Sequence, residues 1–253
     1  MDQNEKTPLL SVKDLAISFG ENRVLTSVSF DLRGFEALGV IGPNGAGKTV
    51  MLNILTGILK PSRGRIELCG NDVTRAGVSE RANMGFGRTF QIPRSFENMT
   101  AYENILVGAV FGNGQSEKAA AAPAARILDE IGLGGRKRVF AGKLGLLDRK
   151  RLEIGIALAA RPKVLLLDEA AGGLTESEVA EILAIVRRIK ESGIGVIWIE
   201  HVLQTMMHGT DRVMLLAEGR SMVCGLPGEV MASREVEEVY LGVQCGRKRL
   251  DGN

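Results

Sequence analysis

The chain has 253 residues, of which 45% are hydrophobic and 25% are charged, and its formal net charge is +2. A chain of this length and composition is expected to bury a full core as one large domain. The small charge excess gives no electrostatic reason to expect a nucleic-acid partner, and no apolar run approaches the ~18 residues that a membrane-spanning helix needs.

The N-terminus is polar over its first six residues and has no apolar segment typical of a signal peptide. We therefore expect the chain to stay in the cytoplasm. Its three cysteines, Cys69, Cys224 and Cys245, are unevenly spaced and include no C-x-x-C pair. We expect them to be free thiols.

Strand signals recur along the chain as short apolar or alternating runs bounded by turn residues. The last two form a hairpin around Glu218-Gly219. The expected strands lie at residues 12–19, 24–32, 37–41, 65–69, 85–91, 163–167, 195–199, 211–217 and 220–224.

Helix signals lie between these strands, and Pro123 is expected to break one of them because proline has no N–H and clashes with the preceding turn. The expected helices lie at residues 50–55, 100–111, 119–131, 148–160 and 176–192.

The alternation of strands and helices predicts an α/β fold with a parallel sheet. We expect one domain over residues 10–242, with an N-terminal antiparallel β-subdomain, an inserted helical subdomain at roughly 95–147, and a short polar tail at 243–253.

A P-loop, G-x-x-x-x-G-K-[ST], follows the apolar strand 37–41 and precedes a helix. Glycines allow backbone angles that a Cβ would block, and successive N–H groups then form an anion site at the helix N-terminus. Lys48 is expected to reach the β- and γ-phosphates, and the Thr49 hydroxyl to ligate Mg²⁺. The expected ATP-binding residues here are Gly42, Pro43, Asn44, Gly45, Ala46, Gly47, Lys48, Thr49 and Val50.

Two further apolar strands end in polar residues. The first ends in Asp168-Glu169, an arrangement in which the aspartate holds Mg²⁺ and the glutamate polarises the attacking water. The second is followed by His201, which could orient that water, although a lone histidine after a strand is more often structural.

The order of these motifs resembles the ATP-binding subunit of ABC transporters over residues 10–242. Segments such as "GRTFQIPRSFENMTAYENILVG", "KRLEIGIALAARPKVLLLDE" and "WIEHVLQTMM" are similar to the ATPases of branched-chain, or hydrophobic, amino acid importers. The ending "MASREVEEVYLG" is similar to the C-terminal element of that group.

The resemblance implies roles for individual residues. Phe19 matches the aromatic residue that stacks on adenine, and Gln91 matches a glutamine that contacts Mg²⁺ and the γ-phosphate. Glu169 matches the catalytic base and His201 the switch histidine, so Glu169, His201 and Gln91 are the expected catalytic residues and Thr49, Gln91 and Asp168 the expected metal ligands. Residues after Gln91 fall where the family docks its membrane permease, namely Pro93, Arg94 and Phe96.

The chain departs from the family in the signature motif, which here is Leu144-Gly145-Leu146-Leu147-Asp148. Gly145 replaces a serine, and Leu147 replaces a glycine whose backbone approaches the γ-phosphate of the partner subunit; Asp148 adds a negative charge. Outside the signature, Thr175 replaces an acid or amide, Ala170 a proline, and Val50 a threonine.

Family members dimerise head to tail, with each ATP between one subunit's P-loop and the other's signature. The departures therefore predict one strong and one weak site in a heterodimer, or a neutral change.

We predict an ATPase subunit of an importer for branched-chain or related hydrophobic amino acids. The expected partners are a second ATP-binding subunit, two permease subunits and, indirectly, a solute-binding protein, at the cytoplasmic face of the membrane. The alternatives are a nucleotide-binding regulatory ABC subunit with weak turnover, or a soluble non-transport ABC ATPase.

Overall fold

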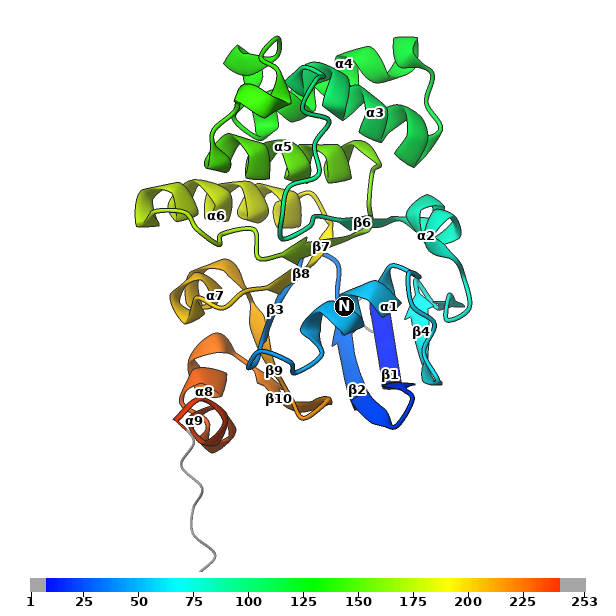
Figure 1. The fold of residues 1–253 in the computed structure, drawn as a ribbon, viewed down its shortest axis with the longest axis vertical. Helices are drawn as coiled ribbons and strands as arrows, with labels where there is room; N and C mark the ends of the chain where they lie inside the picture. Colours follow the sequence, from blue (N-terminus) through cyan, green and yellow to red (C-terminus); the bar gives the residue numbers. More distant parts are fainter. Residues whose placement is uncertain (1–7, 242–253) are drawn as a thin grey trace, which may run out of the picture.

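The computed structural model describes residues 8–241, and within them ten strands form one sheet (Figure 1). The strand order is β5-β4-β1-β2-β10-β9-β3-β8-β7-β6. The Cys245 and C-terminal tail predictions fall outside the described residues. Cys69 and Cys224 are free and exposed.

The N-terminal part of the sheet is antiparallel, as predicted. β1 pairs with β2 on one side and with β4 on the other, and β4 pairs with β5. These strands are β1 (Leu10–Phe19), β2 (Asn22–Leu32), β4 (Arg63–Leu68) and β5 (Asn71–Asp72).

The other half of the sheet is parallel apart from its hairpin. β3 pairs in parallel with β8 and β9, β7 pairs in parallel with β8 and β6, and β10 folds back antiparallel on β9. The carboxyl ends of β3, β7 and β8 therefore meet at one edge of the sheet. These strands are β3 (Ala37–Ile41), β6 (Phe86–Arg88), β7 (Val164–Asp168), β8 (Gly195–Ile199), β9 (Arg212–Ala217) and β10 (Arg220–Gly225).

Every residue of β3, β7 and β8 is buried, because both faces of this sheet are covered. Successive side chains point into two different cores. In β7, for example, Leu165 and Leu167 pack in the core shared with the helical layer, whereas Leu166 packs in the core shared with α1 and the antiparallel strands. This alternation confirms the α/β prediction.

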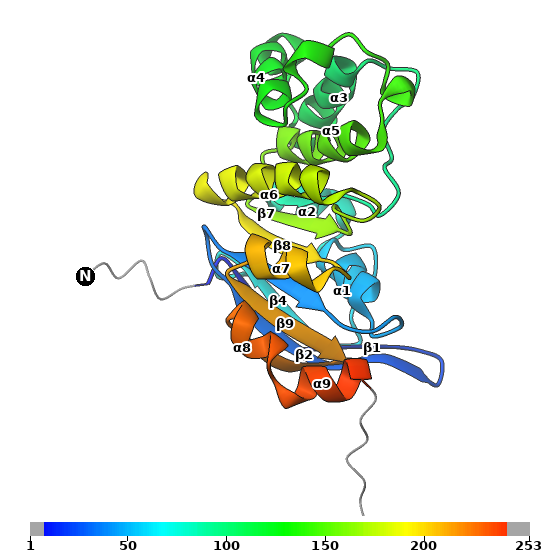
Figure 2. The same cartoon turned by 90° about the vertical axis from the view of Figure 1, so that its left-hand side faces the viewer.

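Helices α3, α4 and α5 stack at one end of the molecule, and α6 lies between α5 and the sheet in both views (Figures 1 and 2). The short helices α8 and α9 lie at the other end. The helices are α1 (Lys48–Leu55), α2 (Val78–Met84), α3 (Ala101–Asn113), α4 (Glu117–Glu130), α5 (Leu146–Ala159), α6 (Glu176–Glu191), α7 (Leu203–Gly209), α8 (Pro227–Met231) and α9 (Arg234–Leu241), with 3-10 turns at Gly134–Arg136 and Ala141–Lys143.

The prediction that Pro123 breaks its helix is wrong. α4 starts at the Ser116 N-cap and continues through Pro123. Ala120, Ala124 and Leu128 are fully buried along one face of α4, and this packing outweighs the lost hydrogen bond.

The structure also adds and shortens elements. α2 was missed, although Glu80 three residues after the Gly77 cap is a helix-start signal. The strand predicted at 85–91 ends at Arg88. Thr89 N makes the last hydrogen bond to β7, at Leu166 O, and the next N–H, that of Phe90, donates to the Glu153 side chain of α5 instead. Among the described residues, none of the helices is both long and apolar enough to span a bilayer.

Candidate functional site

The loop between β3 and α1 requires glycine at specific positions. Gly42 has φ of 154°, and a Cβ there would lie 2.0 Å from Leu216 O. Gly47 has φ of 100°, and its Cβ would lie 2.5 Å from Leu25 Cδ2. The predicted loop is therefore a close-fitting structure that begins α1 directly at Lys48.

A cavity of about 790 Å³ opens over this loop. The unpaired N–H groups at the N-terminus of α1 make its floor suited to an anion. The cavity is lined by Val24, Asn44, Gly45, Ala46, Gly47, Lys48, Thr49, Val50, Gln91, Glu169, Ile199 and His201.

Lys48 is buried in the floor of this cavity. Its Nζ donates to Gly42 O at 2.6 Å and to Pro43 O at 3.0 Å. Burial lowers the pKa of Lys48, while the charges of Glu169 and Asp168 act in the opposite direction. The ammonium is thus held by the loop's own carbonyl groups, within the cavity that a phosphate would enter.

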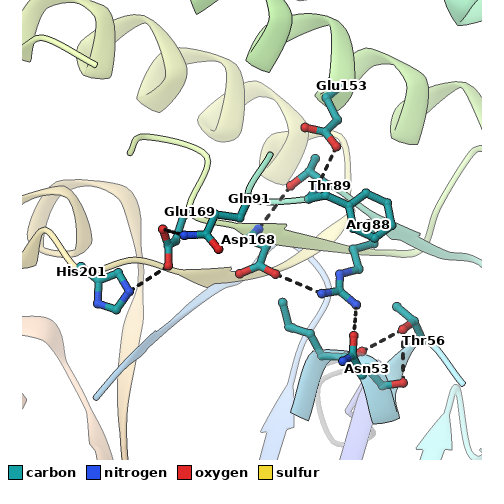
Figure 3. Close-up of polar contacts among 11 residues, drawn as sticks. Asn53, Thr56, Arg88, Thr89, Gln91, Glu153, Asp168, Glu169 and His201 are labelled. Atoms are coloured by element: carbon teal, nitrogen blue, oxygen red, sulfur yellow. Dashed lines mark hydrogen bonds and ion pairs between the residues drawn. The ribbon is translucent and has the colours of Figure 1, made fainter. Parts of the chain in front are cut away.

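Three predicted catalytic side chains meet at the rim of the cavity (Figure 3). Gln91 Nε2 donates to Glu169 Oε2 at 2.7 Å, and His201 Nε2 lies 2.8 Å from Glu169 Oε1. They follow three different strands, β6, β7 and β8, and parallel pairing brings the ends of these strands together.

Glu169 has a left-handed backbone, with φ of 51°. A proline at the next position would push the preceding residue toward extended conformations. Ala170, one of the departures from the family pattern, is compatible with the observed turn, which directs the Glu169 carboxylate between Gln91 and His201.

Asp168 lies beneath this group, and Arg88 holds it. Arg88 Nη2 lies 3.0 Å from Asp168 Oδ2 with both side chains buried, and Nη1 donates to Asn53 Oδ1 of α1 at 2.6 Å (Figure 3). Asp168 N also donates to Thr89 Oγ1 at 3.2 Å. Arg88 was not among the predicted site residues; its only signal was a charged residue in the strand expected at 85–91.

The predicted metal ligands offer oxygen atoms, the donors that Mg²⁺ prefers. The exposed Thr49 hydroxyl and the Gln91 side chain line the cavity and fit a magnesium ion bound together with substrate phosphates. Asp168 is buried and does not line the cavity, and Arg88 contacts only one of its carboxylate oxygens among the contacts of the described residues. Phe19 does not line the cavity either: it ends β1 and is 48% exposed.

The sequence pattern of the ABC transporter family matches residues 25–172, more than half of the chain. The chain belongs to the ABC transporter ATP-binding family. It is 34% identical to the high-affinity branched-chain amino acid transport ATP-binding protein LivG of Salmonella typhimurium over 93% of this chain and 98% of that protein. It is also 34% identical to the lipopolysaccharide export ATP-binding protein LptB of Acidithiobacillus ferridurans, with the same coverage.

The crystal structure of the ADP conformation of MJ1267, an ATP-binding cassette of an ABC transporter, superposes with a TM-score of 0.87. Its sequence is 29% identical, and the match covers 94% of this chain and 100% of that one. The fold prediction is therefore confirmed, and the chain is an ABC transporter ATPase subunit. Because LivG and LptB relatives match equally well, the importer type is not established by likeness alone.

The ABC signature segment begins α5. Gly145 is the N-cap, and a Cβ there would meet no atom within 4 Å. Leu146 is the more exposed leucine, at 47%, whereas Leu147 is partly buried against its own core. Leu144 is buried.

The negative charge predicted at Asp148 is balanced within the subunit. The Asp148 carboxylate is buried and pairs with Arg136 and Arg151. The negative charge that Asp148 was expected to add near the partner's phosphate is therefore paired with two arginines of its own subunit.

Thr175 has a local structural role. It is the N-cap of α6, where its backbone N donates to Glu178 Oε2 at 2.8 Å and its hydroxyl accepts from Glu178 N at 3.4 Å. This reciprocal capping satisfies helix N–H groups that would otherwise lack partners.

Proposed function

We propose that this ABC subunit hydrolyses Mg²⁺-bound ATP to power an importer of branched-chain or related hydrophobic amino acids. The observation that carries the catalytic part is the Glu169 carboxylate, held between Gln91 and His201 at the rim of the P-loop cavity. The solute class is supported by the LivG relatives and by the importer-like segments of the sequence.

The P-loop binds the phosphates through its N–H groups, and Lys48 exchanges its two loop carbonyls for phosphate oxygens. Thr49, Gln91 and Asp168 would hold Mg²⁺, which supplies charge neutralisation of the phosphates when bound. Glu169 accepts a proton from the attacking water. Each Glu169 carboxylate oxygen already contacts a side chain, Oε2 that of Gln91 and Oε1 that of His201. The attacking water must therefore replace one of these contacts or share an oxygen with it.

In this proposal the chain works as part of a dimer on two permease subunits, at the cytoplasmic face of the membrane. Exposed apolar side chains follow Gln91, with Ile92 at 78% and Phe96 at 53% exposure, and Phe140 is 46% exposed. These exposed apolar side chains support a contact with the permease at this segment. Crosslinkers placed at Arg94 or Ser95 should capture a permease subunit, and capture only from the C-terminal region would overturn this placement.

The equal likeness to LptB supports a second candidate, an exporter ATPase for a lipid-linked substrate. Deleting the gene and measuring leucine uptake separates the two. Lost uptake that returns with wild-type chain but not with Glu169→Gln supports the importer, whereas normal uptake with a defective outer surface supports the exporter.

The regulatory alternative is tested on the purified chain. Turnover with and without its partner ATPase should show ATP hydrolysis that depends on Glu169. ATP binding without any Glu169-dependent turnover in either condition would favour the regulatory function.

A further inference from the structure

Two buried charged side chains on α5 contact the backbone of the catalytic segments from inside the protein. They are Lys150 and Glu153, which we call the α5 pair; each is 6% exposed. The same helix begins with the signature segment, which in the ABC family contacts the ATP bound to the partner subunit. Neither residue touches the P-loop cavity.

Glu153 fixes the chain one residue before Gln91. Its Oε1 accepts from Phe90 N at 2.8 Å (Figure 3). This bond comes directly after the last sheet hydrogen bond, in which Thr89 N donates to Leu166 O. Two guanidinium groups also lie over the Phe90 ring, that of Arg88 at 5.0 Å and that of Arg94 at 4.4 Å from the ring centre. The start of the Gln91 segment is therefore attached to α5 rather than to the sheet.

Lys150 fixes the other catalytic segment. Its Nζ donates to Glu169 O at 2.7 Å. The neighbouring Ala171 N donates to the buried carboxylate of Glu200 at 2.6 Å, and Glu200 also attracts Lys150 electrostatically. One turn of α5 thus holds the backbones on both sides of the Gln91–Glu169 hydrogen bond.

Buried charges are costly unless they are hydrogen-bonded, and an apolar residue would fill these positions at lower cost. The α5 pair instead provides hydrogen bonds of defined direction to the two catalytic backbone segments. We propose that Lys150 and Glu153 are positioning residues that couple the orientation of the signature helix to Gln91 and Glu169 of the same subunit. A shift of α5 on closing against a partner would then move the catalytic pair with it. This inference rests on the proposed ATPase function.

The test compares Glu153→Leu, which fills the space without an acceptor, with Glu153→Gln, which keeps an acceptor oxygen. Glu36→Leu is the matched control, because Glu36 is also a buried carboxylate that accepts a backbone N–H, from Arg33 N at 2.7 Å, but precedes β3 at the end away from the P-loop. Steady-state turnover, the Kd for a fluorescent ATP analogue and hydrogen exchange are measured on the full purified chain.

We expect Glu153→Leu to lower kcat by about tenfold or more with an unchanged Kd, because small misplacements of catalytic groups are costly. Hydrogen exchange in residues 89–94 should rise by about fivefold from the loss of one hydrogen bond. Glu153→Gln should restore both values, and Glu36→Leu should change neither.

Unchanged exchange in residues 89–94, or equal kcat loss in Glu36→Leu, would overturn the inference. If the wild-type chain hydrolyses no ATP either alone or with its partner ATPase, the proposed function fails while the exchange measurement still decides the attachment. Should Glu153→Leu fail to fold, Lys150→Met against Lys150→Arg makes the same comparison, with kcat lost in the first and recovered in the second.

Discussion

An ABC dimer would bring two parts of each subunit to ATP, the P-loop end and the signature end, and these two parts differ in how tightly they are packed. The P-loop end is tightly constrained, because a side-chain carbon at Gly42 would overlap a carbonyl oxygen of β9. The signature end has open space at Gly145 and an exposed Leu146 beside it. The sequence keeps Lys48, Asp168 and Glu169 at the first end, whereas Leu147 replaces a glycine at the second, so chemistry should depend on the first far more strongly.

The largest expected effects are at the P-loop end. Lys48→Ala should abolish ATP binding or turnover, because it removes the charge that faces the phosphates.

Glu169→Gln should keep ATP binding, trap a closed dimer and lower turnover by about 100-fold or more. Binding isotherms, size-exclusion chromatography with ATP and phosphate release distinguish the two; full hydrolysis by Glu169→Gln would remove Glu169 from the role of base.

Adding a Cβ should be harmful at the P-loop end and nearly neutral at the signature end. Gly42→Ala forces a left-handed backbone and a 2.0 Å contact, so it should weaken ATP binding strongly and destabilise the protein by roughly 1–3 kcal/mol. Gly145→Ala meets open space at a φ of −68° and should leave stability nearly unchanged. Thermal melts and ATP titrations measure both, and equal destabilisation would contradict the comparison.

The pH dependence of stability gives the next largest effect. Burial raises the pKa of Glu153 from 4.5 to about 7, so the folded state binds more protons than the unfolded state between these values. The free energy of unfolding should therefore fall as pH rises from 4.5 through 7. Glu153→Gln should raise Tm at pH 8 by an amount equivalent to about 1–3 kcal/mol and by little at pH 4.5. A gain that is the same at both pH values would contradict this origin.

The smallest expected change is at the signature. Leu147→Gly should raise turnover of the homodimer by about fivefold. A glycine would let the backbone approach the partner's γ-phosphate, and this factor corresponds to about one restored hydrogen bond. It should also lower Tm slightly, because Leu147 packs against its own core. Leu146→Gly is the control and should not raise turnover.

A partner with an intact signature should raise turnover further, through this chain's Glu169. Removing the partner's equivalent glutamate should then cost little. If the purified chain is already a fast ATPase and Leu147→Gly changes nothing, the departure is neutral.

Much of the site could be predicted from local sequence because its parts are contiguous. The P-loop and Asp168-Glu169 each sit at the end of one buried strand, and a short continuous apolar run indicates each of those strands. Gln91 and His201 needed the family resemblance, since a single polar residue after a strand has no distinctive local signal. Their roles remain predictions, although the structure brings both to Glu169.

The sequence by itself determined the α/β class, every strand along the chain except the two-residue β5, and the P-loop, since these follow from local apolar patterns and backbone restrictions on glycine. Only the tertiary structure showed the continuity of α4 through Pro123, the pairing of Arg88 with Asp168, the balanced charge of Asp148 and the contacts of Lys150 and Glu153. The physical reason is that each of these depends on burial against residues distant in the chain. Burial outweighs local propensity in α4, and in the other cases tertiary packing determines which charge or backbone group each ionised side chain contacts.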